Sequence, residues 1–397
     1  MTATAFTPTP STPTTEHVSF RRWLGVAAVA VGTFAVVTVE QLPVGLLTPI
    51  GGDLGVSEGA AGLMVTVPGL VASAAAPLLP VAIGRLDRRI VLIGLMALMV
   101  LANLMSALAP SFAVLLVSRF LVGISIGGFW ALAAGIAVRM VPESRVPQAT
   151  AITFGGATAA NVLGIPAGTL IGGFTDWRVA FAIVGGLGLL VAIALAMLLP
   201  SMPATQPVRL RTLAQQLRNP AVRAGVLATF MLVSGHFAAF TFISPILAGV
   251  AGVDKDLVGV LLLVFGVAAI IGSAVVGMFA GRNLRATVIA VGVALAAVLA
   301  LFPVLGDNPV GGITLLVLWG LAFGGVPVSV QSWILLAAPG SAEPATALNT
   351  SVFNLAIALG ALFGGLVADN VAITGVLWFG ALLAVLTALA VGRVRVG

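Results

Sequence analysis

Residues 23–50 read WLGVAAVAVGTFAVVTVEQLPVGLLTPI, an apolar run in which Glu40 is the one charged residue. An α-helix needs ~20 apolar residues to cross a bilayer, so this run is long enough to span a membrane. An ionised carboxylate inside hydrocarbon costs at least ~2.5–3.5 kcal/mol on insertion scales. The run therefore predicts a transmembrane helix, and the cost of its acid indicates that Glu40 has a function.

The composition of the whole chain is typical of a membrane protein. Of its 397 residues, 60% are hydrophobic and 8% are charged, whereas soluble domains carry ~25% charged residues. The 48 glycines suit helices that pack closely in lipid. The chain has no cysteine, which excludes disulfides and thiolate metal sites. We expect a polytopic protein whose partner is the lipid bilayer, with no metal and no other cofactor.

Breaks at charges, prolines and glycines divide the chain into twelve apolar spans. The strands of a membrane barrel would be about half as long and would alternate in polarity, so we predict an all-α membrane protein with twelve transmembrane helices. The predicted spans are 23–50, 57–84, 89–109, 111–139, 147–173, 178–200, 221–248, 255–281, 285–305, 309–338, 343–369 and 373–392.

The arginines between the spans predict the orientation. The net charge is +6, but the basic residues are scattered between apolar spans, which favours positive-inside topology over a nucleic-acid partner. Most arginines fall on the cytoplasmic side if both termini are cytoplasmic, and we expect the cytoplasmic membrane as the location. The predicted parts are a disordered cytoplasmic tail at 1–22, six-helix bundles at 23–200 and 221–397, and a cytoplasmic linker at 201–220 that contains a short helix.

The two halves share a repeat at an offset of 197 residues. Gly62 then matches Gly259 and Gly127 matches Gly324, while Arg88 matches Arg285. Single glycine matches carry little weight in a glycine-rich chain, but these share one offset over several spans. We therefore predict two pseudo-symmetric six-helix bundles, with a substrate site between them near the middle of the membrane.

Four stretches carry recognisable patterns of glycine with charged residues, proline or histidine. The loop after the second span reads GRLDRRIV from Gly84, in which Asp87 can satisfy a helix N-terminus or an arginine. The fourth span contains RFLVGISIGG from Arg119, whose counterpart in the second half is Leu316, so the repeat itself does not require an arginine there. The fifth span contains GGATAANVLGIPAGTLIGG from Gly155, and the seventh contains GHFAAFTFISPIL, residues 235–247.

With these motifs the chain resembles the major facilitator superfamily along its whole length. Within it the chain is similar to the twelve-span drug and sugar efflux antiporters, including sugar- or arabinose-efflux-like permeases. The resemblance implies the major facilitator fold, and export rather than uptake. Thr169 stands where the antiporter motif has proline. The resemblance assigns gating to Gly84, Asp87, Arg88 and Arg89, and the antiporter motif to Gly155, Gly164, Pro166, Gly168, Gly172 and Gly173.

Glu40 and Arg119 have similar predicted depths. At ~1.5 Å per residue, Glu40 lies ~15 Å and Arg119 ~12 Å from the outer ends of their spans, so we predict an intramembrane ion pair. Burial favours the neutral acid and the arginine favours the anion, so Glu40 could bind and release a proton. A static pair that fixes packing is the alternative. His236 is a second candidate for proton coupling, or a substrate contact.

Polar and aromatic residues near the middle of the spans are candidate substrate contacts. An unpaired amide there is costly, and aromatic rings can line a cavity, although most of them pack or face lipid. The predicted substrate-binding residues are Phe34, Gln41, Trp130, Asn161, His236, Phe240, Phe353 and Asn354.

These features predict a proton-coupled antiporter that exports a small molecule such as a sugar, a nucleoside or an amphipathic drug by alternating access. A proton-coupled uptake symporter for a small polar solute is the alternative. An intramembrane enzyme is disfavoured, because the chain has no cysteine and its histidines are His17 and His236. A channel or receptor is a third possibility, which ion current without counter-transport would indicate. We expect a monomer.

Overall fold

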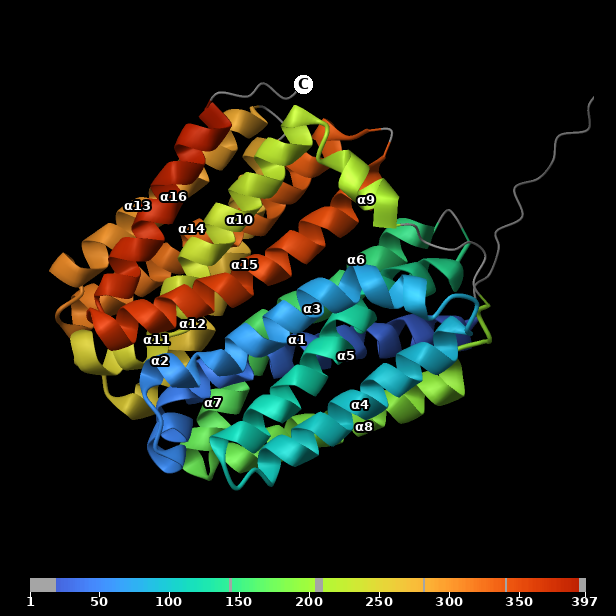
Figure 1. The fold of residues 1–397 in the computed structure, drawn as a ribbon, viewed down its shortest axis with the longest axis horizontal. Helices are drawn as coiled ribbons and strands as arrows, with labels where there is room; N and C mark the ends of the chain where they lie inside the picture. Colours follow the sequence, from blue (N-terminus) through green and yellow to red (C-terminus); the bar gives the residue numbers. More distant parts are fainter. Residues whose placement is uncertain (1–18, 143–144, 204–209, 281–282, 340, 393–397) are drawn as a thin grey trace, which may run out of the picture.

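The computed structural model describes residues 19–142, 145–203, 210–280, 283–339 and 341–392. Within these ranges, twelve helical spans are long and apolar enough to cross a membrane, and they form two bundles that lie side by side (Figure 1). The predicted fold, twelve helices in two six-helix bundles, is confirmed.

The first bundle runs from blue to green in Figure 1. Its helices are α1 (Phe20–Leu54), α2 (Glu58–Ala61), α3 (Leu63–Ala82), α4 (Arg88–Ala107), α5 (Phe112–Arg139), α6 (Val146–Ala159), the π-helical turn η2 (Ala160–Gly164), α7 (Ile165–Phe174) and α8 (Trp177–Leu198).

The second bundle runs from yellow to red, and α9 (Leu210–Gln216) precedes it as the short helix of the linker (Figure 1). α9 contacts α3 of the first bundle and α15 of the second. The elements of the second bundle are α10 (Pro220–Phe240), α11 (Ile243–Pro245), η3 (Ile246–Val250), η4 (Lys255–Leu257), α12 (Val258–Ala280), α13 (Leu284–Leu305), α14 (Pro309–Ala337), α15 (Ala342–Asn370) and α16 (Gly375–Gly392).

Several predicted boundaries differ from the structure. The predicted tail extended to residue 22, but Phe20 already begins α1, and residues 1–18 lie outside the described ranges. The predicted second span is broken between α2 and α3 at Gly62. The seventh is broken after Phe240, where a turn separates α10 from α11. Apolar composition does not show such breaks, because a short interruption leaves each stretch apolar overall.

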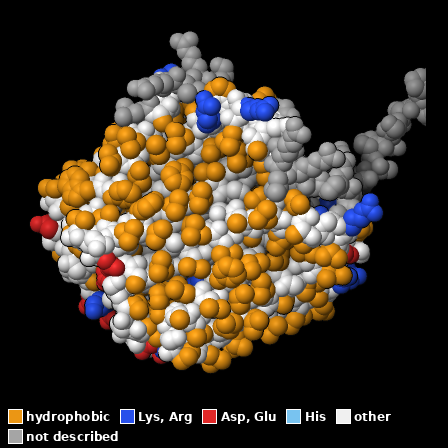
Figure 2. All heavy atoms as spheres, in the orientation of Figure 1, with side chains coloured by type: hydrophobic (Ala, Val, Ile, Leu, Met, Phe, Trp, Pro, Cys, Tyr) orange, Lys and Arg blue, Asp and Glu red, His pale blue; other side chains and the backbone are white. Residues whose placement is uncertain are grey.

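The two ends of the molecule differ in charge. The loops at one end carry Arg85, Arg88 and Arg89 and lie beside α9, and we call this the arginine-rich end. The opposite end carries Asp53, Asp176 and Asp369, and we call it the acidic end. Between the charged ends, hydrophobic side chains cover the visible face (Figure 2). That belt is the surface expected to meet lipid.

Equivalent contacts recur in the two halves. A Cβ added to Gly127 would meet the Ala72 carbonyl oxygen, and one added to Gly324 would meet the oxygen of Ala269. Both pairs are related by the offset of 197. The Arg89 guanidinium donates to the Ala196 carbonyl, just as Arg285 donates to Gly392.

The predicted match of Arg88 with Arg285 is therefore wrong by one position. Arg89 makes the equivalent hydrogen bond, since both partners of the Arg89 pair are shifted by 196 residues in the second half. A one-residue difference in loop length changes the offset between α3 and α4 without changing the packing of the helices.

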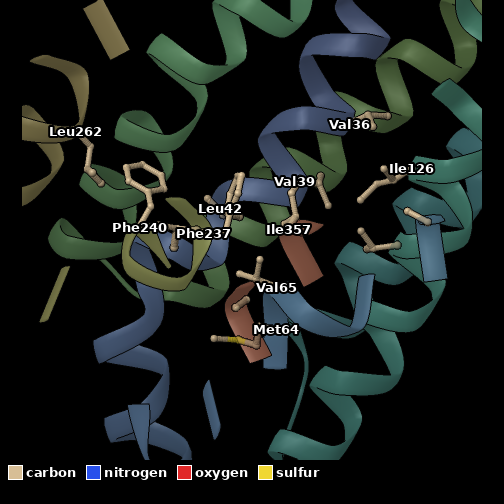
Figure 3. Packing of buried hydrophobic residues seen from close by; sticks show 14 of the residues in the cluster. Val36, Val39, Leu42, Met64, Val65, Ile126, Phe237, Phe240, Leu262 and Ile357 are labelled. Atoms are coloured by element: carbon tan, nitrogen blue, oxygen red, sulfur yellow. The ribbon is translucent and has the colours of Figure 1, made fainter. Parts of the chain in front are cut away.

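One buried apolar cluster continues from the first bundle into the second. In Figure 3, Val36, Val39 and Ile126 lie on one side, Phe240 and Leu262 on the other. Met64, Val65 and Ile357 lie between them (Figure 3). The middle of the contact between the bundles is thus filled with apolar side chains. A polar group at this level is therefore a candidate functional residue.

Candidate functional site

Arg119 lies at the centre of the first bundle and is fully buried. From α5 it reaches three neighbouring helices. Its Nη1 donates to the Val39 carbonyl of α1 at 3.1 Å, and its Nη2 donates to the Ser106 hydroxyl of α4 at 3.1 Å. Its Cζ lies 4.9 Å from the centre of the Phe181 ring of α8, a cation–π distance. Arg119 therefore ties α1, α4 and α8 to α5.

The acceptor on α1 is available because of a proline four residues further on. In an α-helix the N–H of residue 43 would bond to the carbonyl of residue 39, but residue 43 is Pro43, which has no N–H. The Val39 carbonyl is left without its helical donor, and Arg119 supplies one. Arg119 of the fourth-span motif and Pro43 of TVEQLP therefore act together: the proline frees the Val39 carbonyl and the arginine bonds to it.

The predicted ion pair between Glu40 and Arg119 is wrong. The ion pairs found among the described residues join Arg178 to Asp53 and to Asp176. The side chains of successive residues in a helix differ in direction by ~100°. The Arg119 guanidinium bonds to the Val39 carbonyl, and the side chain of the next residue, Glu40, points in another direction. The Glu40 side chain is 6% exposed, and no described group pairs with its carboxylate.

Other polar atoms beside Glu40 also lack protein partners. Gln41 is 6% exposed and Thr38 is 3% exposed. Neither the Gln41 Oε1 nor the Thr38 hydroxyl has a hydrogen-bond partner among the described residues. Buried polar groups are normally paired. One turn of α1 therefore presents three polar side chains with an oxygen that no described residue pairs with.

His236 lies in α10 and is packed between aromatic rings. The Phe323 ring stacks on it at 3.4 Å between centroids and 8° between planes, and Phe240 stacks at 4.7 Å and 21°. The Trp319 Nε1–H donates to His236 Nδ1 at 3.1 Å. Since tryptophan is a donor only, His236 Nδ1 must be unprotonated, and the neutral ring carries its proton on Nε2. No described group accepts that proton.

The remaining predicted substrate residues are distributed over both bundles. Trp130 is half-buried and lies 5.9 Å from Phe154 between ring centroids. Asn161 is exposed, and its amide donates to the Ala157 carbonyl of its own helix. The buried Asn354 donates in the same way to Thr350. The structure does not gather these residues with Glu40 into one cluster.

The two phenylalanines that complete the prediction differ in position. Phe353 of α15 is half-buried and packs against the apolar cluster of Figure 3. Phe34 of α1 is half-buried and lies in a groove formed with α6 and α8.

The glycines of the fifth span pack against α1, but not all of those predicted do. A Cβ at Gly164, Gly168 or Gly172 would come within 2.4 Å of Thr38, Leu42 or Leu46 respectively, four residues apart on α1. A Cβ at Gly155 would meet nothing within 4 Å. Pro166 is the second residue of α7 and is buried. The placement of the Gly173 side-chain position is not described.

Gly156 makes the close contact that the motif assigned to Gly155. A Cβ there would lie 2.0 Å from the Ala30 carbonyl oxygen. Two α-helical turns take ~7.2 residues, and the π-turn η2 takes up about one more. Gly156 and Gly164, eight positions apart, therefore fall on one face. The doubled glycine at 155–156 was the one signal in the sequence that could have indicated this choice.

The loop with the predicted gating residues is held within its own bundle. Asp87 caps α4 by accepting from the Arg89 N–H, as the sequence suggested, and also accepts from the Ser201 hydroxyl and the Met202 N–H. Partial burial alone would raise the pKa of Asp87, but these hydrogen bonds outweigh it and hold that pKa below its ordinary value. Gly84 has a φ of +47°, which favours glycine.

Arg88 is buried, and its Nη1 has no partner among the described residues. Its backbone N–H donates to the Met202 carbonyl at 3.0 Å. Together with Asp87, it fastens the start of α4 to residues 201 and 202 after α8. Whether this loop gates transport stays a prediction.

At the acidic end, a contact joins the two bundles that sequence reasoning missed. Asp369, at the end of α15, accepts from the Ser57 hydroxyl at 2.7 Å and from the Gly59 N–H at 3.0 Å. Its carboxylate thus caps α2 from the opposite bundle. A Cβ at Gly59 would lie 2.4 Å from the Gly365 carbonyl oxygen, so the backbones touch there. No pattern local to either segment indicates a contact between residues this far apart in the chain.

A polar network in the second bundle was also missed. The Thr229 hydroxyl donates to Asn349 Oδ1 at 2.7 Å, and the Gln331 amide donates to the Thr346 hydroxyl at 2.9 Å. Asn349 Nδ2 approaches Gln331 Oε1 at 3.4 Å. The network links α10, α14 and α15. Two amides and two threonines spread over three spans gave no sign in the sequence that they meet.

Comparisons with known proteins agree with this architecture. The model of the Major Facilitator Superfamily matches residues 29–353. Purine ribonucleoside efflux pumps named NepI, from Salmonella enteritidis and Salmonella typhimurium, are 36% identical over 382 residues, which is 96% of this chain and 96% of each pump.

Solved structures share the fold at low identity. A bacterial homologue of the human lysosomal transporter Spinster, inward-facing and unoccupied, gives a TM-score of 0.71 at 18% identity and covers 95% of each chain. The inward-facing occupied form gives 0.72 at 18% identity, over 94% of this chain and 95% of the other. Since the family match covers most of the chain and the pumps align over nearly all of it, this protein belongs to the major facilitator superfamily of membrane transporters.

Proposed function

We propose that this transporter exports purine nucleosides across the cytoplasmic membrane in exchange for protons, with both termini in the cytoplasm and the acidic end outside. The nucleoside is suggested by the pumps that are 36% identical over 96% of the chain. The exchange with protons rests on one observation, the turn of α1 on which the Glu40 carboxylate and the Gln41 Oε1 are buried without a partner among the described residues.

Glu40 is the proposed proton carrier. Ionising an acid that is buried without a counter-ion is costly, so the carboxyl keeps its proton while dry and exchanges it when water reaches it. Arg119 is engaged by the Val39 carbonyl, one residue away along the backbone. It therefore contributes a fixed positive charge near Glu40 without forming a pair that would lock the acid as an anion.

The aromatic cluster around His236 supports a planar, uncharged substrate. Nucleic-acid bases stack on aromatic faces, with ~1–3 kcal/mol per base in single-strand binding proteins. Phe240, Phe265 and Phe323 all stack with His236. In the present state these rings stack on one another, and a base would replace one of those contacts. The unpaired Nε2–H of His236 is a donor for a ring nitrogen or carbonyl of the base.

The contact at the acidic end supports a state that is closed to the outside. Asp369 of α15 bonds to residues 57 and 59 of the first bundle, and α12 of the second bundle contacts α7 and η2 of the first. Release of substrate to the outside would require these contacts to separate. Rocking of the bundles about the central cluster of Figure 3 is the motion that alternating access needs.

The test uses purified protein in liposomes that contain a labelled purine nucleoside. An imposed proton gradient should drive the nucleoside in the direction opposite to proton flow. Movement in the same direction as the protons would instead identify an uptake symporter, and movement indifferent to the gradient would reject coupling. A panel of nucleosides, sugars and cationic drugs in the same assay identifies the class of substrate independently of whether its transport is coupled to protons.

The matched variant is Glu40→Gln, which keeps the shape of the side chain and removes its proton chemistry. It should lose gradient-driven transport and retain exchange of labelled for unlabelled nucleoside. Asp307→Asn is the control, because Asp307 lies in a loop at the acidic end next to Asn308. Full gradient-driven transport by Glu40→Gln would refute the role of Glu40.

A further inference from the structure

A groove of about 350 Å³ lies between α1, α6 and α8, and the proposed transport mechanism does not use it. Its lining is apolar, with the glycines of α6 on one side. The residues that form it are Ala30, Val31 and Phe34 of α1, Gly155, Gly156 and Ala159 of α6, and Leu187 of α8.

The α8 wall of the groove lies on the side of the first bundle that is away from the second (Figure 1). α8 packs against α1, α4 and α7, which all belong to its own bundle. Val31 is 43% exposed, and Gly155 is exposed. These two residues are part of the outer wall of a membrane span, where the surrounding solvent is lipid.

Local sequence explains why the groove exists. Gly156 brings α6 against the α1 backbone at Ala30. Its neighbour Gly155 points to the outside with no atom within 4 Å of where a Cβ would be. A side chain at position 155 would fill the space that the glycine leaves. The doubled glycine therefore produces both the close helix contact and the groove beside it.

The depth of the groove suits one leaflet of the bilayer. α1 begins at Phe20 at the arginine-rich end, so Ala30 and Phe34 lie ~15–21 Å along the helix from that end. Half of a hydrocarbon core is ~15 Å. A lipid whose headgroup sits at the arginine-rich end would bring the inner part of its acyl chain to the level of the groove.

Arginines mark the same end of the helices that form the groove. Arg22 lies in the first turn of α1 and is exposed. Arg145 precedes α6, where its Nη1 donates to Gln148. Arg21 donates to the Met197 carbonyl near the end of α8 and so holds α1 and α8 together. Basic clusters between transmembrane helices at the cytoplasmic side bind acidic lipid headgroups.

We propose that this flank of the first bundle is a binding site for one anionic phospholipid. Its acyl chain lies in the groove against Ala30 and Gly155, and its phosphate is bound by Arg22 and Arg145. The acyl chain of any lipid would fit an apolar groove, so the arginines at the start of α1 and α6 make the site selective for acidic headgroups. This inference is independent of the transported substrate.

The test uses the full-length protein in vesicles of phosphatidylcholine and phosphatidylglycerol in equal parts. In one preparation the phosphatidylglycerol carries a photoreactive diazirine in its acyl chain, and in the other the phosphatidylcholine carries it. With labelled phosphatidylglycerol, crosslinks should concentrate on peptides of α1, α6 and α8. Labelling spread evenly over lipid-facing helices, or equal labelling by the two lipids, would overturn the proposal.

Two variants separate the chain from the headgroup. Gly155→Leu fills the groove and should remove the α6 crosslinks, whereas Gly94→Leu, at an equally open and exposed glycine of α4, should leave them unchanged. Arg22→Gln should reduce the preference for phosphatidylglycerol by about fivefold. Arg223→Gln, at the start of α10, should not.

Unchanged α6 crosslinks in Gly155→Leu, or an unchanged lipid preference in Arg22→Gln, would contradict the assigned site. The arginine variant keeps the test informative if the leucine variant does not fold, because Arg22 is exposed and the hydrogen bond from its backbone N–H to the Ser19 carbonyl is one that glutamine keeps. Gel filtration of each variant before reconstitution reports folding.

Discussion

The Arg119 guanidinium donates to the one carbonyl of α1 that Pro43 deprives of its helical donor, that of Val39. The pair explains why an arginine is buried in the centre of a bundle without an acid beside it. Its charge is met by a carbonyl, a hydroxyl and an aromatic face instead. The backbone next to Glu40 is thereby fixed, while its carboxyl has no ion-pair partner in the described part of the chain.

This relationship predicts a specific coupling between two substitutions. Arg119→Leu leaves the buried Val39 carbonyl without a donor and should lower the free energy of unfolding by about 1–3 kcal/mol. In a Pro43→Ala background, the new N–H of residue 43 can bond to that carbonyl, so the same arginine substitution should cost less. The free energies of unfolding of the unsubstituted protein, the two single variants and the double variant are measured in mixed micelles. The coupling free energy between the two substitutions is expected at ~1 kcal/mol.

Ser106→Ala is the control for that cycle, because it removes the other acceptor of Arg119 and leaves the carbonyl contact intact. Its effect should not depend on residue 43. Strict additivity of Pro43→Ala and Arg119→Leu would show that the arginine stabilises the bundle by some route other than the freed carbonyl.

The two adjacent glycines of the fifth span predict opposite outcomes for the same substitution. Gly156→Ala places a methyl group 2.0 Å from the Ala30 carbonyl oxygen, so α6 must move away from α1, at about 1–3 kcal/mol. Gly155→Ala meets nothing and should be neutral or slightly stabilising, because alanine favours helices. Thermal unfolding in detergent distinguishes them, and equal melting temperatures would contradict the assigned packing.

The bond from Asp369 to the start of α2 predicts a shift in the balance between closed and open states. Asp369→Asn removes the charge of the acceptor, which should weaken closure by ~1 kcal/mol and raise the open population at that end about fivefold. Because the chain has no cysteine, spin labels at Gly52→Cys and Val371→Cys would report the distance between bundles. Asp307→Asn should leave that distance distribution unchanged, and a similar shift there would indicate a general charge effect.

The hydrogen bonds to Asp87 predict a dependence of stability on pH. Its folded pKa is lowered, so its contribution is fully present above the unfolded pKa of ~3.9. The contribution is lost as the pH falls through the lower folded value. Asp87→Asn should therefore melt below the unsubstituted protein at neutral pH, and the gap should narrow in acid. A gap that widens below pH ~4 would have the wrong sign for a lowered pKa.

Helix number and the repeat could be predicted from sequence because both depend on local composition. A span such as 23–50 is apolar whatever it packs against, and matched glycines at 127 and 324 record the same close packing twice. The breaks after Gly62 and Phe240 could not be placed in this way. They interrupt the helix within a stretch that is apolar enough overall to be taken as one span.

The sequence alone determined that this protein crosses the membrane twelve times in two related bundles, because the transfer of apolar side chains into lipid is an additive, local free energy. Only the tertiary structure decided that Arg119 bonds to Val39 and not to Glu40, and that Gly156 rather than Gly155 meets α1. Those choices depend on the rotation of each helix. A missing N–H at Pro43 and one extra residue in the π-turn η2 alter that geometry without altering composition.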